Sequence, residues 1–180
     1  MGEGMKRSIG QLLWLMTLMP PLCCQLVVAF ATPGTCSLNH PGGCLGYSFE
    51  KDGRKIFYAT DNELEITPGD VFPDPANTGP LRHFPEALVQ AAHGADLLVL
   101  DAQYDDKEYA SRKKWGHSSC FSATDFAIQA GAKNLALFHH DPESTDRKLD
   151  EMVHSCRQRA HSRGAELIIM AAREGVELKF

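Results

Sequence analysis

The sequence is short of positive charge. Its 180 residues contain 18 Lys and Arg against 23 Asp and Glu, for a formal net charge of −5. This argues against an indiscriminate phosphate-binding surface, because non-specific affinity for nucleic acids comes mainly from clustered Lys and Arg. The only compact basic run beyond the N-terminus, residues 112–114, is typical of a solvated loop or helix end. We therefore expect no strong nucleic-acid-binding signal.

The six cysteines lack a CxxC pair and any zinc-finger spacing, which argues against a structural zinc knot. We interpret them as reduced, small hydrophobic residues. The eight histidines are more informative, because imidazole is a common ligand for zinc and other transition metals. A chain of this length holds one domain with a sizeable core, so we look for one site. The sequence leaves open whether the chain forms a homo-oligomer.

Charged residues are absent from residues 8–49. Lys6 and Arg7 stand before an apolar run, residues 9–31, that ends in small residues, an order typical of a signal peptide. Prolines and a glutamine within the run interrupt a clean membrane helix. Export or membrane anchoring is one hypothesis. The other is the remainder of a truncated start, in which residues 26–30 form a buried strand.

We divide the chain into an apolar segment, residues 1–35, and an α/β domain, residues 36–180. Apolar and polar residues alternate over 46–50 and again over 55–60, and Asp52-Gly53 between them supplies a turn. This pattern predicts a β-hairpin.

Beyond the hairpin, predicted strands alternate with predicted helices. We expect an irregular connection over 67–85, helices over 84–93, 119–130 and about 144–163, and strands over 96–100, 134–138, 167–170 and 176–178. The fold class is therefore α/β, with polar residues gathered at the ends of strands.

Four segments in loops or at strand ends carry residues of the types that bind metals. They are Leu38–Gly43 with His40, Tyr58–Asp61, Trp115–Ser119 with His117, and Leu137–Pro142 with His139, His140 and Asp141. Each is weak alone, because a loop histidine usually lies on the surface and an aspartate after a strand usually forms a turn. Their order along the chain gives them weight.

Together these segments resemble the second half of metallo-β-lactamase-fold hydrolases, especially the branch near ribonuclease Z and phosphodiesterase-like bacterial members. The stretches LNHPGGCLGYSFEKDGRKIFYATDNE, ADLLVLDAQY, WGHSS and LALFHHDP carry the resemblance, which covers about Leu38 to Phe180. It implies an αββα sandwich, incomplete here because only the C-terminal half matches. It also implies up to two divalent ions, zinc or manganese, and a small-molecule or nucleotide phosphodiester as substrate. The resemblance favours the hypothesis of a truncated start over that of export, and a cytoplasmic location is therefore expected.

The resemblance also implies roles for single residues. His40 matches the histidine that binds the first metal, Asp61 the carboxylate that bridges both metals, and His139 the last histidine, which binds the second. His117 matches a histidine beside the scissile phosphate that is a candidate proton donor. A bridging carboxylate suits two nearby cations, because they need hard, charge-compensating oxygen between them.

Three further residues are expected to support the metal ligands. Asp141 would accept an N–H from a ligand imidazole and fix its tautomer, and Asp101 would do the same. His140 is expected to support the ligands and not to bind metal itself. The reason is that His139, and not His140, aligns with the metal ligand of the family when Pro142 is held in register.

The HxHxDH motif, the hallmark of this family, is absent from the sequence. In the family it supplies most metal ligands and the acid that orients the attacking water, so both metal shells are incomplete here. Three hypotheses stay open: a metal-dependent hydrolase that is inactive as this truncated chain, a non-catalytic half-fold protein that acts through association, and an α/β domain with coincidental histidines. The first predicts that His40, Asp61, His117 and His139 meet at one edge of the sheet, and the third predicts that they lie far apart.

Overall fold

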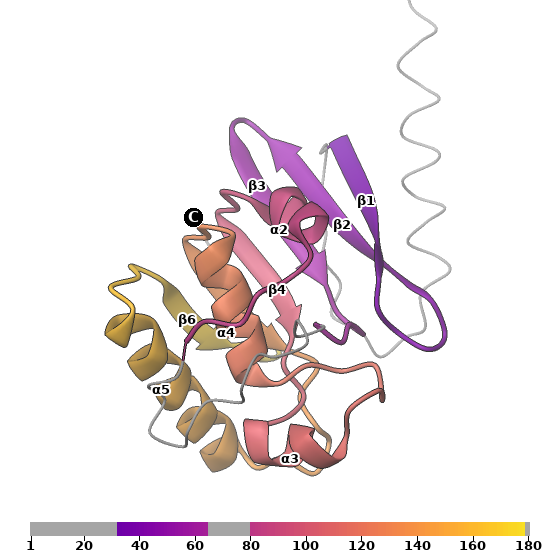
Figure 1. Ribbon diagram of the computed structural model, residues 1–180. Helices are drawn as coiled ribbons and strands as arrows, with labels where there is room; N and C mark the ends of the chain where they lie inside the picture. The colour runs from indigo at the N-terminus through magenta and orange to yellow at the C-terminus, as the bar shows by residue number, and fades with distance from the viewer. Residues whose placement is uncertain (1–31, 65–79, 179–180) are drawn as a thin grey trace, which may run out of the picture.

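The structure is a computed structural model that describes residues 32–64 and 80–178 (Figure 1). One six-stranded sheet has the order β1-β2-β3-β4-β5-β6. Its strands are β1 (Thr32–Leu38), β2 (Cys44–Lys51), β3 (Arg54–Ala59), β4 (Leu97–Asp101), β5 (Asn134–Phe138) and β6 (Ile168–Ala171). The helices are α2 (Glu86–Ala92), α3 (Asp106–Ser111), α4 (Cys120–Gln129) and α5 (Asp146–Ser162). The predicted α/β class is confirmed.

The predicted hairpin is formed by β2 and β3. Asp52 and Gly53 join the two strands with φ angles of 51° and 73°, as a two-residue type I′ turn requires. Strands β1 to β3 pair antiparallel, whereas β3 to β6 pair parallel. Because parallel strands end at the same edge of a sheet, residues that follow β3, β4 and β5 are brought together.

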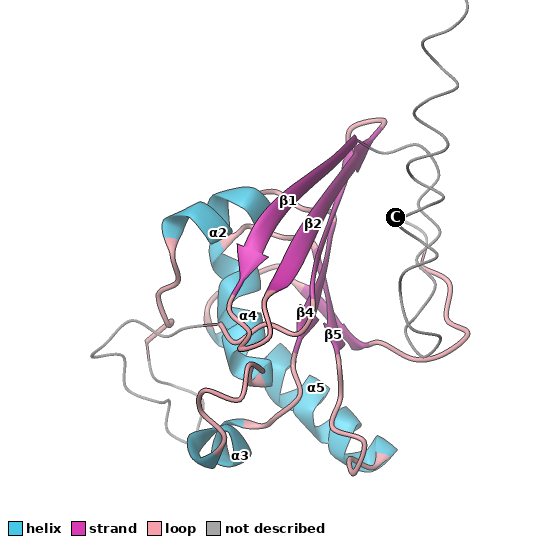
Figure 2. Ribbon diagram, turned by 90° about the vertical axis from the view of Figure 1, so that its right-hand side faces the viewer, coloured by secondary structure: helices cyan, strands magenta, loops and turns pink. Residues whose placement is uncertain are grey.

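Helices α2, α4 and α5 pack against one face of the sheet (Figure 2). Phe57, Leu98 and Leu135 of the sheet join Phe126 of α4 and Cys156 of α5 in one core, each at most 1% exposed. Full burial of a large apolar side chain stabilises a fold by about 1.5–3 kcal/mol. The core therefore holds the strands whose ends build the site.

Helix α4 begins at a side-chain cap close to His117. The Ser119 hydroxyl accepts a hydrogen bond from the backbone N–H of Ser122. Helix α5 begins in the same way at Thr145, close to the predicted start at about residue 144. Since Ser119 lies two residues after His117, the cap of α4 also fixes one end of the loop that carries this histidine.

Three elements differ from the sequence predictions. Strand β1 begins at Thr32, so the sheet includes residues predicted to belong to the apolar segment 1–35. Helix α3 was not predicted, and the predicted strand over 176–178 is wrong. The predictions for residues 1–31, a signal peptide or a strand over 26–30, lie outside the described residues. Within the described ranges, no helix is long and apolar enough to span a bilayer.

Candidate functional site

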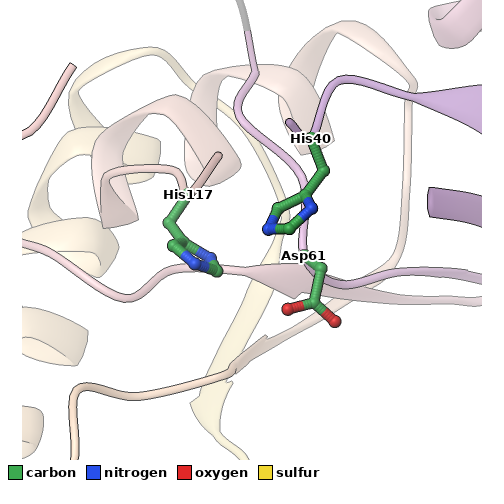
Figure 3. Close-up of side chains that lie close together, drawn as sticks. All are labelled: His40, Asp61 and His117. Atoms are coloured by element: carbon green, nitrogen blue, oxygen red, sulfur yellow. The ribbon is translucent and has the colours of Figure 1, made fainter. Parts of the chain in front are cut away.

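The candidate site lies at the edge of the sheet where β3, β4 and β5 end. Asp61 follows β3, Asp101 is the last residue of β4, and His139 follows β5. His40 comes from the connection between β1 and β2, and His117 from the loop before α4. Figure 3 shows the side chains of His40, Asp61 and His117 together.

All four predicted ligand and donor residues meet at this edge. One candidate atom from each of His40, Asp61 and His117 forms a group whose members lie within 4.8 Å of one another, and Asp101, His117 and His139 form a second such group. The Nε2 atom of His139 is 2.8 Å from Oδ1 of Asp61. The prediction that histidines from distant parts of the sequence would lie far apart is therefore wrong.

Two of these residues have a backbone conformation that L-residues rarely adopt. The φ angle is 50° at Asp61 and 59° at His139. Left-handed non-glycine residues cost free energy and gather at functional sites, where surrounding structure holds them. Both turns occur one or two residues beyond the strand end, where they direct a carboxylate and an imidazole toward each other.

His117 is paired with Asp101. The Nδ1 atom of His117 lies 2.7 Å from Oδ2 of Asp101, and the side chain of Asp101 is 1% exposed. The hydrogen bond to Asp101 raises the pKa of His117, against an opposing effect of burial. Since an imidazole that donates from Nδ1 leaves Nε2 to face the site, His117 can carry a proton there or offer a lone pair.

Asp101 is itself held by the backbone. Its carboxylate accepts N–H groups from Ser118 at 3.0 Å, Gln103 at 3.3 Å and Asn62 at 3.4 Å. The expectation that Asp101 orients an imidazole fits this geometry, with His117 as the partner.

The expectation for Asp141 does not fit the structure. Its carboxylate accepts from the backbone N–H of Glu143 at 2.9 Å and pairs with Arg112 at 3.0 Å, rather than with a site imidazole. These two partners, Glu143 first, lower the pKa of Asp141. His140 contacts the backbone of Ala172, and burial lowers its pKa.

Glu63 and Gly116 were not among the predicted site residues. The buried carboxylate of Glu63 accepts the backbone N–H groups of Lys114 at 2.7 Å and Gly116 at 3.0 Å, and the hydroxyl of Tyr109 at 2.8 Å. Burial, and then the bond to Glu63, raise the pKa of Tyr109, which keeps this hydroxyl a donor. The sequence pointed to Glu63 only through its acidic side chain two positions after Asp61. The residues that donate hydrogen bonds to it lie 46 to 53 positions further along the chain.

Gly116 lets the loop lie directly against His40. A Cβ atom at this position would come within 2.4 Å of Cδ2 of His40, and the φ angle of Gly116 is 94°. On its other side, the Nδ1 atom of His40 accepts the backbone N–H of Gly42 at 3.2 Å. The His40 ring is thus placed by contacts at two positions.

The donor set suits a divalent transition metal. Imidazole nitrogens and carboxylate oxygens are the ligand types of zinc sites, and atoms bound to one such ion lie roughly 3–4 Å apart. The two groups, with spacings up to 4.8 Å, need only small movements to reach this arrangement. His117 belongs to both groups, so it is positioned to act either as a metal ligand or as a proton donor.

Comparisons with known proteins identify relatives of this chain. The family profile described as Beta-lactamase superfamily domain matches residues 21–140, a match that begins before the expected Leu38. Ribonuclease Z from Brevibacillus brevis is 44% identical over 63 residues, 34% of this chain and 19% of that protein. Ribonuclease Z from Halobacterium salinarum is 36% identical over 100 residues, 52% of this chain and 31% of that protein. The chain thus spans less than a third of the length of these relatives.

A solved structure shows the same fold. The metallo-beta-lactamase fold protein YhfI from Bacillus subtilis superposes with a TM-score of 0.52 at 15% identity, over 81% of this chain and 48% of that chain. At this identity the likeness concerns the fold alone. The six-stranded sheet with its helices is therefore one part of a larger arrangement in that protein.

Proposed function

This chain belongs to the beta-lactamase superfamily, and from that membership and the geometry of its site we propose that it is a metal-dependent phosphodiesterase of the ribonuclease Z type. The observation that carries the proposal is the meeting of His40, Asp61, His117 and His139 at one sheet edge, beside the Asp101–His117 pair. Single-stranded or structured RNA is the proposed substrate class, because relatives named ribonuclease Z match the chain. These relatives do not bear out the expectation of no strong nucleic-acid-binding signal, which was drawn from the net charge.

In this proposal His40 and Asp61 would hold a first metal ion, and Asp61 and His139 a second. The bond between Asp61 and His139 already brings their donor atoms to 2.8 Å, so an ion would replace a contact rather than require a new approach. A bound divalent ion, zinc or manganese, supplies Lewis acidity that lowers the pKa of water and stabilises phosphoryl charge. The residues of the chain orient the substrate and donate the proton that the leaving oxygen takes up.

His117 is the proposed proton donor. Asp101 favours its protonated form by a hydrogen bond at Nδ1, which leaves an Nε2 proton for the oxygen that leaves the phosphate. Asp101 acts through His117 and is a positioning residue. General acid assistance of this kind contributes about 10²- to 10⁴-fold in rate.

The chain alone is proposed to turn over slowly. With HxHxDH absent from the sequence, three ligand residues cannot hold two ions in fixed geometry. A cytoplasmic location is part of the proposal, because the four described cysteines are free and reducing compartments keep thiols reduced.

A non-catalytic role through association is the second candidate. One observation favours it: on the face of the sheet opposite the core, the partly exposed side chains of Tyr58, Phe138 and Met170 surround a buried apolar cluster of Leu97, Val99 and Ala136. Among the described helices, α2, α4 and α5 pack on the other face. Metal content separates the two candidates.

Metal uptake and hydrolysis test the proposed function. We expect the purified chain to bind zinc in competition with a chromogenic chelator, and Asp61→Ala to weaken binding at least about tenfold. Asp150→Ala, an exposed acidic residue on α5, is the matched control and should bind as the unaltered chain does. Hydrolysis of bis-p-nitrophenyl phosphate should stay near the Asp61→Ala level. A chain without stoichiometric zinc, or with equal affinity in both variants, would refute the metal site.

A further inference from the structure

Trp115 is a large apolar side chain exposed two residues from His117. It is 61% exposed, whereas apolar side chains of this size are normally buried. An indole offers a flat π-face that stacks on a nucleobase whatever the base is. The exposed ring, two residues from His117, is therefore accessible to a base.

The backbone on both sides of Trp115 is fixed. Lys114 and Gly116, its two neighbours, each donate a backbone N–H to the buried carboxylate of Glu63. Lys114 has a φ angle of 68°, which costs free energy in a residue other than glycine, so the surrounding structure holds the turn that presents the indole. A fixed backbone with an exposed ring is preorganised, which lowers the entropy cost of binding.

Three basic residues precede the indole in the loop, and one of them lies near its ring. The guanidinium of Arg112 lies 5.9 Å from the ring centroid of Trp115 and 4.8 Å from that of Tyr104. Its ion pair with Asp141 holds it between the loop and the end of β5. Lys113 and Lys114 are exposed on the same loop. Cations beside an exposed aromatic ring are the combination that binds the backbone and bases of single strands.

The loop is in contact with the metal-ligand residues. Gly116 packs against His40 so closely that no side chain fits between them, and His117 follows directly. Side chains also link the indole to the site, because Arg112 lies near both the Trp115 and Tyr104 rings and the centroid of the Tyr104 ring is 6.3 Å from that of His117. A base stacked on Trp115 would therefore lie close to the site where a phosphate would be attacked.

We propose that residues 112–116 bind single-stranded nucleic acid next to the reacting phosphate, with Trp115 stacking on a base and Arg112 and Lys114 facing the backbone. The proposal rests on the phosphodiesterase function and names the part of the substrate that the site recognises. RNA and DNA share the bases that stack, so the experiment includes both.

Fluorescence of Trp115 tests the proposal without turnover. The sequence has two tryptophans, so Trp14→Phe leaves Trp115 as the single reporter. In EDTA we expect a single-stranded RNA decamer to quench this fluorescence saturably, and DNA of the same sequence to do so through the same ring. A duplex should quench less, because its bases have no free face.

Affinity for a fluorescein-labelled RNA decamer is then measured by anisotropy for two matched variants. Trp115→Ala should weaken binding about 5- to 150-fold, the range for loss of one stacked base. Trp115→Phe should retain most of the affinity. Ile168→Ala removes an apolar side chain of equal exposure, 61%, on β6 and should change nothing.

The outcomes separate this inference from the proposed function. Absence of quenching by RNA and DNA, or equal affinities for Trp115→Ala and Ile168→Ala, overturns the inference even where zinc binding depends on Asp61. Binding that depends on Trp115 in a chain that takes up no zinc supports the inference and refutes the metal site.

Discussion

At the scale of single residues, the site depends on the lack of a side chain at Gly116 as well as on the side chains that are present. Gly116 has no Cβ atom, and this allows the loop to touch the His40 ring. The same loop is held by Glu63, so neither partner can move away freely. A methyl group here should therefore disturb His40 more than it disturbs the fold.

We predict that Gly116→Ala weakens zinc binding at least about tenfold, because the added carbon would lie 2.4 Å from the His40 ring. The positive φ angle adds a stability cost of roughly 1–2 kcal/mol. Chelator competition measures the first effect and urea unfolding the second.

Gly164→Ala is the control for Gly116→Ala. Gly164 has a φ angle of 65°, and nothing lies within 4 Å of an added Cβ atom. This variant should lose comparable stability and keep its zinc affinity. Equal loss of affinity in the two variants would show that backbone strain, and not contact with His40, causes the effect.

The sequence predicted the residues of the site better than their partners. His40, Asp61, His117 and His139 were singled out by their positions in loops or after strands together with the resemblance to metallo-β-lactamase-fold hydrolases, and for Asp61 and His139 the common edge of parallel strands explains why they meet. The Asp141–Arg112 pair could not be found, because its partners are 29 residues apart and their approach depends on the packing of the loop before α4.

At the scale of elements, Asp96 joins three segments of the sheet. Its side chain, 5% exposed, accepts the backbone N–H of Lys55 in β3 and the ammonium of Lys133 before β5, each at 2.8 Å. Lys133 first and Lys55 second lower the pKa of Asp96. Lys133 is 67% exposed, so solvent weakens its contribution to stability and the backbone bond contributes more.

We predict that Asp96→Asn destabilises the protein by about 1.5–3 kcal/mol at neutral pH, the usual value of hydrogen bonds to a charged group. A carboxyl group whose pKa is lower in the folded state stabilises the fold above its unfolded pKa, and this contribution is lost as the pH falls through the folded pKa. The difference between the two proteins should therefore shrink in acid. Urea unfolding between neutral and acid pH measures it, and a difference independent of pH would contradict the ionic role of Asp96.

The elements that the sequence did not predict have local reasons. Strand β1 contains Pro33 and Gly34, which are depleted in strands, and its partner β2 supplies the pairing that sequence patterns do not contain. Helix α3 has only six residues, and the one sign of it in the sequence is the spacing of Asp105 and Glu108, which form a capping box. The run 176–178 alternates, but three residues are too few for a reliable strand pattern.

At the scale of the whole molecule, a buried ionic cluster joins α4 and α5 to the segment that precedes α2. Asp125 of α4 is fully buried and pairs with Arg159 of α5, whose Nη2 atom lies 2.7 Å away. The same carboxylate accepts the backbone N–H of Arg82 at 3.1 Å, and the Arg159 guanidinium donates to the carbonyl of Pro80 at 3.0 Å. Asp125 thus ties the segment that precedes α2 to both large helices.

We predict that Asp125→Ala destabilises the protein by about 3–5 kcal/mol, because it leaves the fully buried Arg159 without its carboxylate. This is a large part of the total stability of a domain, which is about 5–15 kcal/mol. Arg173→Ala removes an ion pair with Asp150 whose side chains are 55% and 65% exposed, and it should cost at most about 1 kcal/mol. Urea unfolding followed by circular dichroism measures both variants. Similar losses would mean that burial does not decide the strength of these pairs. A large loss in Asp125→Ala alone would show that the helices covering the sheet, and through them the strand ends that carry the site, depend on one carboxylate.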